Sequence, residues 1–196
     1  MYLATSNTTV PSDDKSPNEI DKQLLTAIAS GDKVAFERFY RRYFKKVVGF
    51  AIRTTVNNET AEDVAVDTMM VVWRTANNFG DRSKVSTWVF GIAYRVALKA
   101  CAKNKTDVDD NVEPDELPHE STGMDELERV FLRDQLGRAL QSLSIEQRSV
   151  MELTYYYGCT YPEIGEIMGC PVGTVKTRML HARSNMKHIL STQPRR

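Results

Sequence analysis

Residues 161–183 read YPEIGEIMGCPVGTVKTRMLHAR, and the turn at their centre decides the local fold. Gly169 suits the left-handed position that follows the last turn of a helix. Pro171 cannot continue that helix, but it is well placed to begin the next one. The sequence therefore predicts a short helix over 161–168, a tight turn, and a longer helix over 172–190.

The longer helix carries one apolar stripe and a basic outer surface. The stripe recurs at helical spacing and is expected to pack on Ile164 and Ile167; it consists of Val175, Met179, Ala182 and Met186. No Asp or Glu occurs from Gly169 to the C-terminus. Such a pair of helices is typical of a helix-turn-helix, although a basic helix can also be an ordinary solvated surface. The candidate contacts to a DNA major groove and its phosphates are Lys176, Thr177, Arg178, Leu180, His181 and Arg183.

Charge is distributed unevenly over the 196 residues, although the formal net charge is zero. Residues 20–105 carry 15 bases and 8 acids, and residues 126–196 carry 10 bases and 7 acids. Between them, residues 106–125 carry 8 acids and no base. This pattern indicates two polyanion-binding domains joined by an acidic flexible linker, or two ordinary domains with a solvating spacer. Residues 1–19 are polar and are expected to form a disordered tail.

The predicted fold class is all-α, with two small helical domains, because apolar residues follow the helical period and no segment alternates with period two. Thr60, Ser144 and Thr160 are expected to cap the helices that follow them. Besides the pair described above, helices are expected over 20–30, 33–55, 60–74, 85–103, 125–143 and 145–156.

Several functional classes are disfavoured by composition. No apolar run is long enough to span a membrane, and the N-terminus does not resemble a secretory signal. The three cysteines form no C-x-x-C pair and are not combined with histidines at zinc spacing. No nucleophile elbow or phosphate-binding loop occurs. We therefore expect a cytoplasmic protein without catalytic activity, metal or cofactor.

An acidic cluster marks the segment TAEDVAVDTMMVVWR, residues 60–74. Glu62, Asp63 and Asp67 fall on one side of the predicted helix. Asp63 and Asp67 are four residues apart, where like charges repel by a few tenths of a kcal/mol. The cluster is either a solvated surface or a docking surface for a basic protein partner.

Aromatic and basic residues alternate in KVSTWVFGIAYRVALKACAKNK, residues 84–105. Such a pattern suits binding of single-stranded nucleic acid by stacking, although the aromatic side chains could also belong to the core. The preceding polar loop offers hydrogen-bonding groups to an unstacked base. The candidate residues of this site are Asn77, Asn78, Arg82, Ser83, Lys84, Trp88, Tyr94 and Arg95.

From about Ile20 to Lys187 the chain resembles the extracytoplasmic-function sigma factors, the small members of the sigma-70 family. TAEDVAVDTMMVVWR resembles the stretch with which the family grips the clamp helices of the polymerase β′ subunit. STWVFGIAYRVALKA resembles the stretch that melts and reads the −10 promoter element. YYYGCTYPEIGEIMGCPVGTVKTRMLHARSNMK resembles the helix-turn-helix that reads the −35 element.

This resemblance implies that residues 20–105 are sigma region 2 and residues 126–196 are sigma region 4. The resemblance implies three partners. They are bacterial core RNA polymerase, which would be contacted through its β′ clamp and β flap; promoter DNA, both duplex and single-stranded; and an anti-sigma factor. No membrane insertion is implied. The acidic linker would follow the path of nascent RNA as a charge mimic, or serve as a passive tether.

Two positions depart from the family pattern. Val66 stands where many relatives have glutamine, and His181 stands where relatives often carry arginine. The rival interpretation is a helix-turn-helix regulator that binds duplex DNA without polymerase. It would leave the acidic cluster and the aromatic-basic segment without a role.

Overall fold

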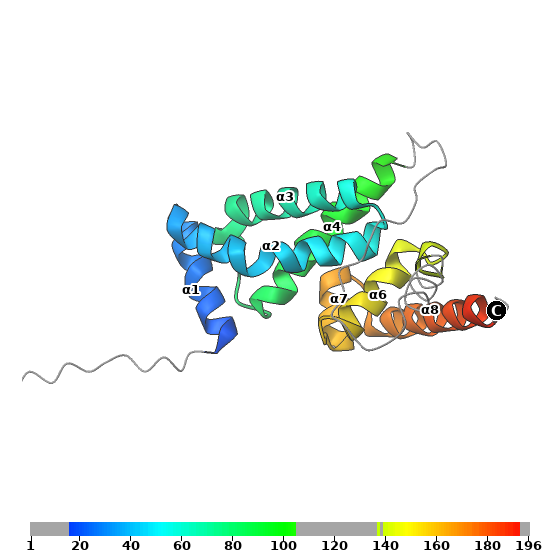
Figure 1. Ribbon diagram of the computed structural model, residues 1–196. Coiled ribbons are helices and arrows are strands. Elements are labelled where there is room, and N and C mark those ends of the chain that lie inside the picture. Colours follow the sequence, from blue (N-terminus) through cyan, green and yellow to red (C-terminus); the bar gives the residue numbers. More distant parts are fainter. Residues whose placement is uncertain (1–15, 105–136, 138, 193–196) are drawn as a thin grey trace, which may run out of the picture.

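The computed structural model describes residues 16–104, 137 and 139–192, and every regular element in these ranges is a helix (Figure 1). This confirms the all-α class. The first domain contains α1 (Pro17–Ala29), α2 (Lys33–Thr55), α3 (Asn58–Thr75), the short 3-10 helix η1 (Ala76–Asn78) and α4 (Val85–Asn104). The second contains α6 (Ile145–Tyr155), α7 (Tyr161–Met168) and α8 (Val172–Thr192). The predicted linker and most of the helix predicted over 125–143 lie outside the described residues.

Side-chain caps determine where the helices begin. The capping box that Ser144 forms with Gln147 opens α6, as the sequence predicted. The third helix begins earlier than predicted, because Asn57 rather than Thr60 is its N-cap. The Asn57 side-chain oxygen accepts a hydrogen bond from the backbone N–H of Thr60 at 2.7 Å. Thr60 therefore lies inside the first turn of α3 and is buried.

The first helix also begins before its predicted start at Ile20. Ser16 and Glu19 form a reciprocal capping box, and Pro17 occupies the first helical position. This combination satisfies the backbone donors at the helix start that water would otherwise have to bind. Residues 17–19, which the sequence analysis placed in the tail, therefore belong to α1.

The core of the first domain lies between α2, α3 and α4. A left-handed residue, Val56, connects α2 to α3 directly, so the two helices run side by side in opposite directions (Figure 1). Phe39, Val47, Val72 and Val89 have no exposed surface and fill the space between these helices. Burial of such side chains is the main source of stability in a small helical domain.

The second domain packs directly on the first, with α7 against α4 and α6 against α2 (Figure 1). One continuous buried cluster contains Phe50 and Phe90 from the first domain and Leu153, Ile167 and Met179 from the second. As a result α4 is covered on most sides. The sequence analysis predicted two domains joined by a linker, and it contained no signal for this docking.

No helix in the described part of the chain is long and apolar enough to cross a membrane.

Candidate nucleic-acid and protein interfaces

The turn between α7 and α8 has the geometry that the sequence predicted. Gly169 adopts φ +62°, and the backbone N–H of Cys170 donates to the carbonyl of Gly165 at 3.0 Å. A Cβ atom on Gly165 would lie 2.9 Å from the Cys170 carbonyl oxygen. The two helices therefore approach each other so closely that only glycine fits at this position, and their relative angle is fixed.

The apolar stripe of α8 is buried, but its two halves pack on different elements. Val175 and Met179 belong to the same buried cluster as Ile164 and Ile167 of α7. Further along, the stripe meets the segment that precedes α6; this second cluster consists of Ala139, Leu143, Ala182 and Met186. The sequence analysis expected the whole stripe on α7, which with only eight residues is too short to cover it.

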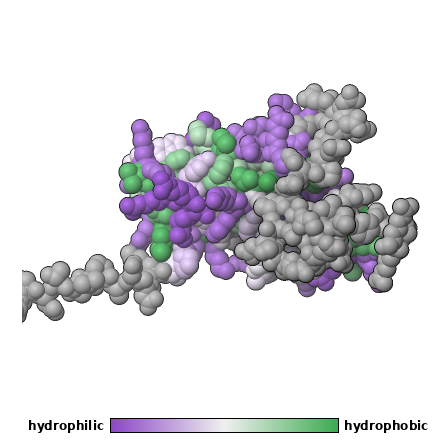
Figure 2. All heavy atoms as spheres, in the orientation of Figure 1, coloured by the Kyte–Doolittle hydropathy of each residue, from purple (hydrophilic) through white to green (hydrophobic). Residues whose placement is uncertain are grey.

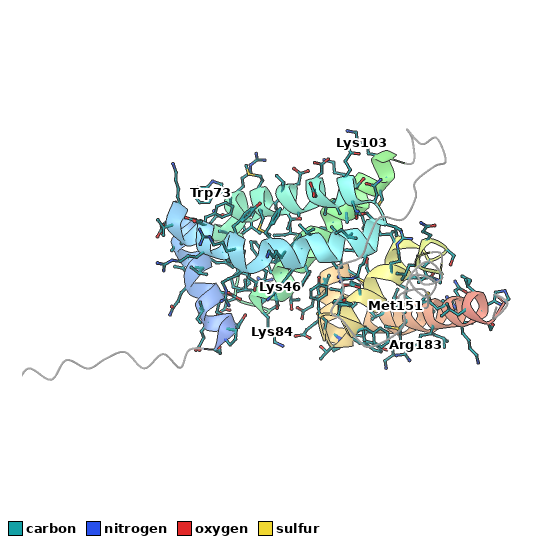
Figure 3. The ribbon with its side chains drawn as sticks, in the orientation of Figure 1. Lys46, Trp73, Lys84, Lys103, Met151 and Arg183 are labelled. Atoms are coloured by element: carbon teal, nitrogen blue, oxygen red, sulfur yellow. The ribbon has the colours of Figure 1, made fainter. Side chains whose placement is uncertain are left out.

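The outward surface of α8 presents most of the predicted duplex-DNA residues. Five of them are exposed: Lys176, Thr177, Leu180, His181 and Arg183. Leu180 is 66% exposed, so it contributes little to the core. Arg183, labelled in Figure 3, donates from Nε to the hydroxyl of Tyr155 in α6 at 2.9 Å, so its side chain is engaged with that helix. Arg178 is half-buried and donates to the Cys170 sulfur at 3.5 Å, so it points toward the turn.

The outer surface of α3 carries the acidic cluster. Glu62, Asp63 and Asp67 are all exposed. The same surface carries two exposed apolar side chains, Val66 at 48% and Met70 at 41%. This surface therefore combines charge with apolar area that can be buried, as protein-docking surfaces do. Sequence reasoning identified the acids but missed Met70, which the i, i+4 spacing from Val66 could have revealed.

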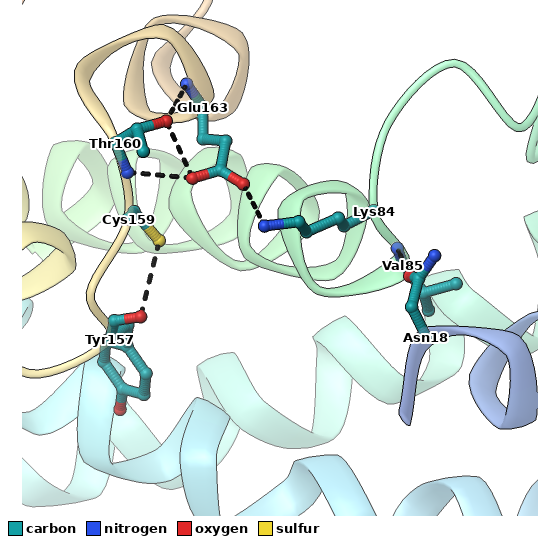
Figure 4. Close-up of polar contacts among 7 residues, drawn as sticks. All are labelled: Asn18, Lys84, Val85, Tyr157, Cys159, Thr160 and Glu163. Atoms are coloured by element: carbon teal, nitrogen blue, oxygen red, sulfur yellow. Dashed lines mark hydrogen bonds and ion pairs between the residues drawn. The ribbon is translucent and has the colours of Figure 1, made fainter. Parts of the chain in front are cut away.

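The loop that precedes α4 is fastened to α1. Lys22 forms an ion pair with Asp81 at 2.6 Å, and the Asn18 side-chain oxygen accepts from the backbone N–H of Val85 at 2.9 Å (Figure 4). Trp88 is half-buried and packs edge-on against Phe79, with ring centroids 5.5 Å apart. The predicted loop residues are exposed, apart from Ser83, which is half-buried; the exposed ones are Asn77, Asn78, Arg82 and Lys84.

Lys84 reaches from this loop to the second domain. Its ammonium group lies 2.8 Å from Glu163, the carboxylate that also caps α7 by accepting from the N–H and hydroxyl of Thr160 (Figure 4). The hydrogen bond from Lys84 lowers the pKa of Glu163. Because the Lys84 side chain is 64% exposed, water screens this pair and it contributes little to docking.

Two aromatic residues of the predicted −10 segment are inaccessible in this arrangement. Phe90 and Tyr94 are each 3% exposed, and burial raises the pKa of Tyr94 to about 12. The Phe90 ring lies 4.4 Å from that of Tyr157 in the second domain. Arg95 remains exposed on the same helix. Tyr94 could therefore contact DNA only after the domains separate.

A buried ion pair lies at the centre of the domain interface. Arg53 of α2 and Glu152 of α6 are 2.9 Å apart, with side chains 13% and 8% exposed. The Arg53 guanidinium also lies 3.6 Å from the centre of the Tyr156 ring. Burial raises the pKa of Glu152 to about 7, although Arg53 acts in the opposite direction.

Two hydrogen bonds to backbone carbonyls complete this interface. The Tyr157 hydroxyl donates to the carbonyl of Lys46 at 2.7 Å, and Arg148 donates from Nε to the carbonyl of Thr54 at 2.8 Å. Both join α2 to the second domain. No local pattern in the sequence indicates them, because the partners are about 100 residues apart.

The fold and its surfaces define a class: a helix-turn-helix protein with a second helical domain that carries an exposed acidic and apolar surface. Comparison with known proteins specifies the family. Residues 39–106 match the model for Sigma-70 region 2, and residues 133–186 match the model for Sigma-70, region 4.

Named relatives agree with this match. The chain is 31% identical over 182 residues to the RNA polymerase sigma-H factor of Pseudomonas aeruginosa, covering 88% of this chain and 94% of that relative. It is 30% identical over 178 residues to the ECF RNA polymerase sigma factor SigK of Mycobacterium bovis, covering 85% and 91% of the two chains.

Solved structures show the same fold. The sigma factor RpoE of Bartonella quintana, in complex with the anti-sigma factor NepR, matches with a TM-score of 0.62 and 25% identity over 81% of this chain and 98% of that one. CnrH, in complex with the cytosolic domain of CnrY, shares the fold with a TM-score of 0.65 and 21% identity, over 89% and 99% of the two chains. The chain thus belongs to the extracytoplasmic-function group of the sigma-70 family and is an alternative sigma factor.

Proposed function

We propose that the chain binds bacterial core RNA polymerase in the cytoplasm, directs it to promoters with −35 and −10 elements, and promotes melting of the DNA. The single observation that carries this proposal is the combination of the exposed acidic-apolar surface of α3 with the exposed basic surface of α8 in one chain of this family. A regulator that only binds duplex DNA would need the second surface but not the first.

The α3 surface is the proposed contact to the β′ clamp. Asp63 and Asp67 would pair with basic side chains of the polymerase, and Val66 and Met70 would bury apolar area beside them. Fully desolvated apolar anchors surrounded by charge are typical of tight protein interfaces. The second domain would contact the β flap, as in the family.

The loop over 77–84 and Trp88 are the proposed contacts to the −10 element. Asn77, Asn78 and Arg82 are exposed and offer donors and acceptors to a base that has left the duplex. Unstacking costs a few kcal/mol for each step, and stacking on an aromatic ring returns about 1–3 kcal/mol for each base. Tying the loop to α1 keeps this site in place before DNA arrives.

The exposed surface of α8 is the proposed contact to the −35 element. Lys176, Arg178 and Arg183 would reach phosphates or guanine edges, and Leu180 would contact a thymine methyl group. Arg178 would first have to leave Cys170.

The docked arrangement of the domains suggests that polymerase binds before the −10 site can engage DNA. Tyr94 is buried at the interface and Lys84 is engaged by Glu163, so the −10 site is incomplete while the domains are docked. Polymerase binding would separate the domains and hold each at its promoter element. The second DNA contact then becomes intramolecular and gains effective concentration. An anti-sigma factor, as in the complex of the Bartonella relative, would act before this step.

Run-off transcription with purified core polymerase tests the proposal. The double change Asp63→Arg and Asp67→Arg should abolish the promoter-specific transcripts that the unchanged chain supports, because it reverses the charge of the clamp surface. The double change Glu37→Arg and Glu166→Arg alters net charge equally at exposed acids elsewhere and should leave transcription intact. Equal transcription from both variants would refute the clamp contact.

A further inference from the structure

The most strongly charged helix among the described residues is α2, to which the proposed function gives no role. It carries seven bases and one acid, a net charge of +6. Five bases lie three or four residues apart, so they share one side of the helix, and all five are exposed. We call this surface the α2 basic face; it consists of Arg38, Arg41, Arg42, Lys45 and Lys46.

Acidic neighbours neutralise only part of this face. Arg41 pairs with Glu37 at 2.6 Å, and Arg42 pairs with the buried Asp21 at 2.7 Å. Within the described ranges Arg38, Lys45 and Lys46 form no ion pair, since Lys46 only lies 5.5 Å from the centre of the Tyr43 ring. Like charges at this spacing repel one another by a few tenths of a kcal/mol for each pair. A bound polyanion would relieve that repulsion.

Two neighbouring helices of the first domain, α2 and α3, carry net charges of opposite sign. α3, which packs along α2, carries four acids and one base, a net charge of −3. In Figure 3 Trp73 of α3 lies on one side of the domain, and Lys46 of α2 lies on the other together with Lys84. Figure 2 shows a hydrophilic band across α2 in the same view. An acidic side suits a basic protein, whereas a basic side attracts phosphates.

The α2 basic face begins next to the proposed −10 loop, because α1 touches both. Lys22 of α1 holds Asp81 of the loop at 2.6 Å, and the adjacent Asp21 holds Arg42 of α2 at 2.7 Å. A strand whose bases are captured by the loop can therefore continue over α1 onto α2. Along that route the acids Asp81 and Asp21 are each paired with a base.

We propose that the α2 basic face binds the phosphate backbone of the unpaired DNA strand as it leaves the −10 loop. This inference rests on the proposed function for the origin of that strand, but the charge and exposure of the face do not depend on it. Charged side chains attract phosphates without stacking on bases, so this surface would track the backbone without reading sequence.

The salt dependence of binding tests this directly. The triple variant Arg38→Gln, Lys45→Gln, Lys46→Gln removes the three unpaired bases from the full chain. Each lost phosphate contact on a single strand lowers the slope of log K against log salt concentration by about 0.7, so we expect a loss of roughly 2. The slope is measured for the holoenzyme on a premelted promoter and for the chain alone on a single-stranded oligonucleotide. A duplex oligonucleotide of the same sequence serves as the comparison.

Three controls make the result specific. The variant Lys33→Gln, Lys99→Gln, Lys187→Gln changes net charge equally at exposed positions on three helices and should keep the slope within about 0.7 of the unchanged chain. The variant Arg38→Lys keeps the positive charge and should therefore leave the slope unchanged. Circular dichroism checks that the triple variant is folded; if it is not, Lys45→Gln with Lys46→Gln replaces it, with an expected loss of about 1.4.

The outcomes separate this inference from the proposed function. An unchanged slope in both measurements, or an equal loss in the scattered control, would overturn the role of the α2 basic face. An equal loss on duplex and single-stranded oligonucleotides would also overturn it, because the face would then be a general polyanion surface. If the unchanged chain forms no promoter complex with polymerase, the proposed function fails, while the oligonucleotide measurement still decides the inference.

Discussion

The protonation of Glu152 should control the docking of the two domains. Its carboxylate is buried against Arg53, and burial raises its pKa from 4.5 to about 7. In the separated chain the side chain would be exposed and would return to its ordinary pKa. Because the pKa is higher in the docked form, that form binds the proton more tightly. Docking is therefore strongest below pH 4.5 and weakens as the pH rises from 4.5 to 7. Above pH 7 the free energy of docking no longer changes with the protonation of Glu152.

The size of the effect follows from the shift. The pKa difference between 4.5 and about 7 changes the free energy of docking by about 3 kcal/mol over the whole pH range. Between pH 5.5 and 7.5 the change is about 2 kcal/mol, which is roughly a twentyfold change in the docking equilibrium. Small-angle scattering measures it, since separated domains have a larger radius of gyration. Sub-denaturing urea brings the docked and separated forms to comparable populations.

A neutral variant isolates Glu152 from other titrating groups. Glu152→Gln has nearly the same shape but cannot ionise, so its radius of gyration should not change between pH 5.5 and 7.5. The unchanged chain should expand over the same interval. A radius of gyration that is constant in the unchanged chain, or that rises equally in the variant, would refute the reasoning.

Three further predictions concern stability and DNA reading. Gly165→Ala should destabilise the second domain by about 1–3 kcal/mol in urea unfolding, because its Cβ would meet a backbone oxygen, whereas Gly173→Ala, with open space around it, should not destabilise it. Asp21→Asn should cost about 2–3 kcal/mol in thermal unfolding, because Arg42 and the Tyr43 hydroxyl lose a buried anionic partner; a loss below 0.5 kcal/mol would contradict this. Leu180→Ala should leave unfolding unchanged and weaken binding to the −35 element by about 1 kcal/mol in a gel-shift assay, and equal binding would exclude a thymine contact.

Local signals predicted the helices well because each was encoded within a few residues. The capping boxes at Ser144 and Thr160 and the left-handed Gly169 are all as expected. The start of α3 was misplaced because both Asn57 and Thr60 can cap a helix, and only the conformation of the chain decides between them. The exposed positions of Asp63, Asp67 and Leu180 also follow from helical spacing alone.

The domain interface could not be predicted in this way. Arg53 and Glu152 are 99 residues apart, and each looks like an ordinary surface charge in its own helix. Likewise, Tyr94 in the aromatic-basic segment is consistent with either stacking or burial until α7 is seen to cover it. The charge count located the basic first domain, and helical spacing places the bases of α2 on one face. Only the three-dimensional arrangement shows that this face is exposed and adjoins the loop over 77–84.

The shared core of the two domains also affects the fate of the chain before it finds polymerase. Phe50, Phe90 and Tyr157 shield one another from water in the docked form. Separated domains would expose this aromatic surface, which favours aggregation and attack by proteases. Docked molecules would therefore resist aggregation and proteolysis better than molecules whose domains are separated. Their lifetime would shorten whenever the domains open without polymerase to receive them.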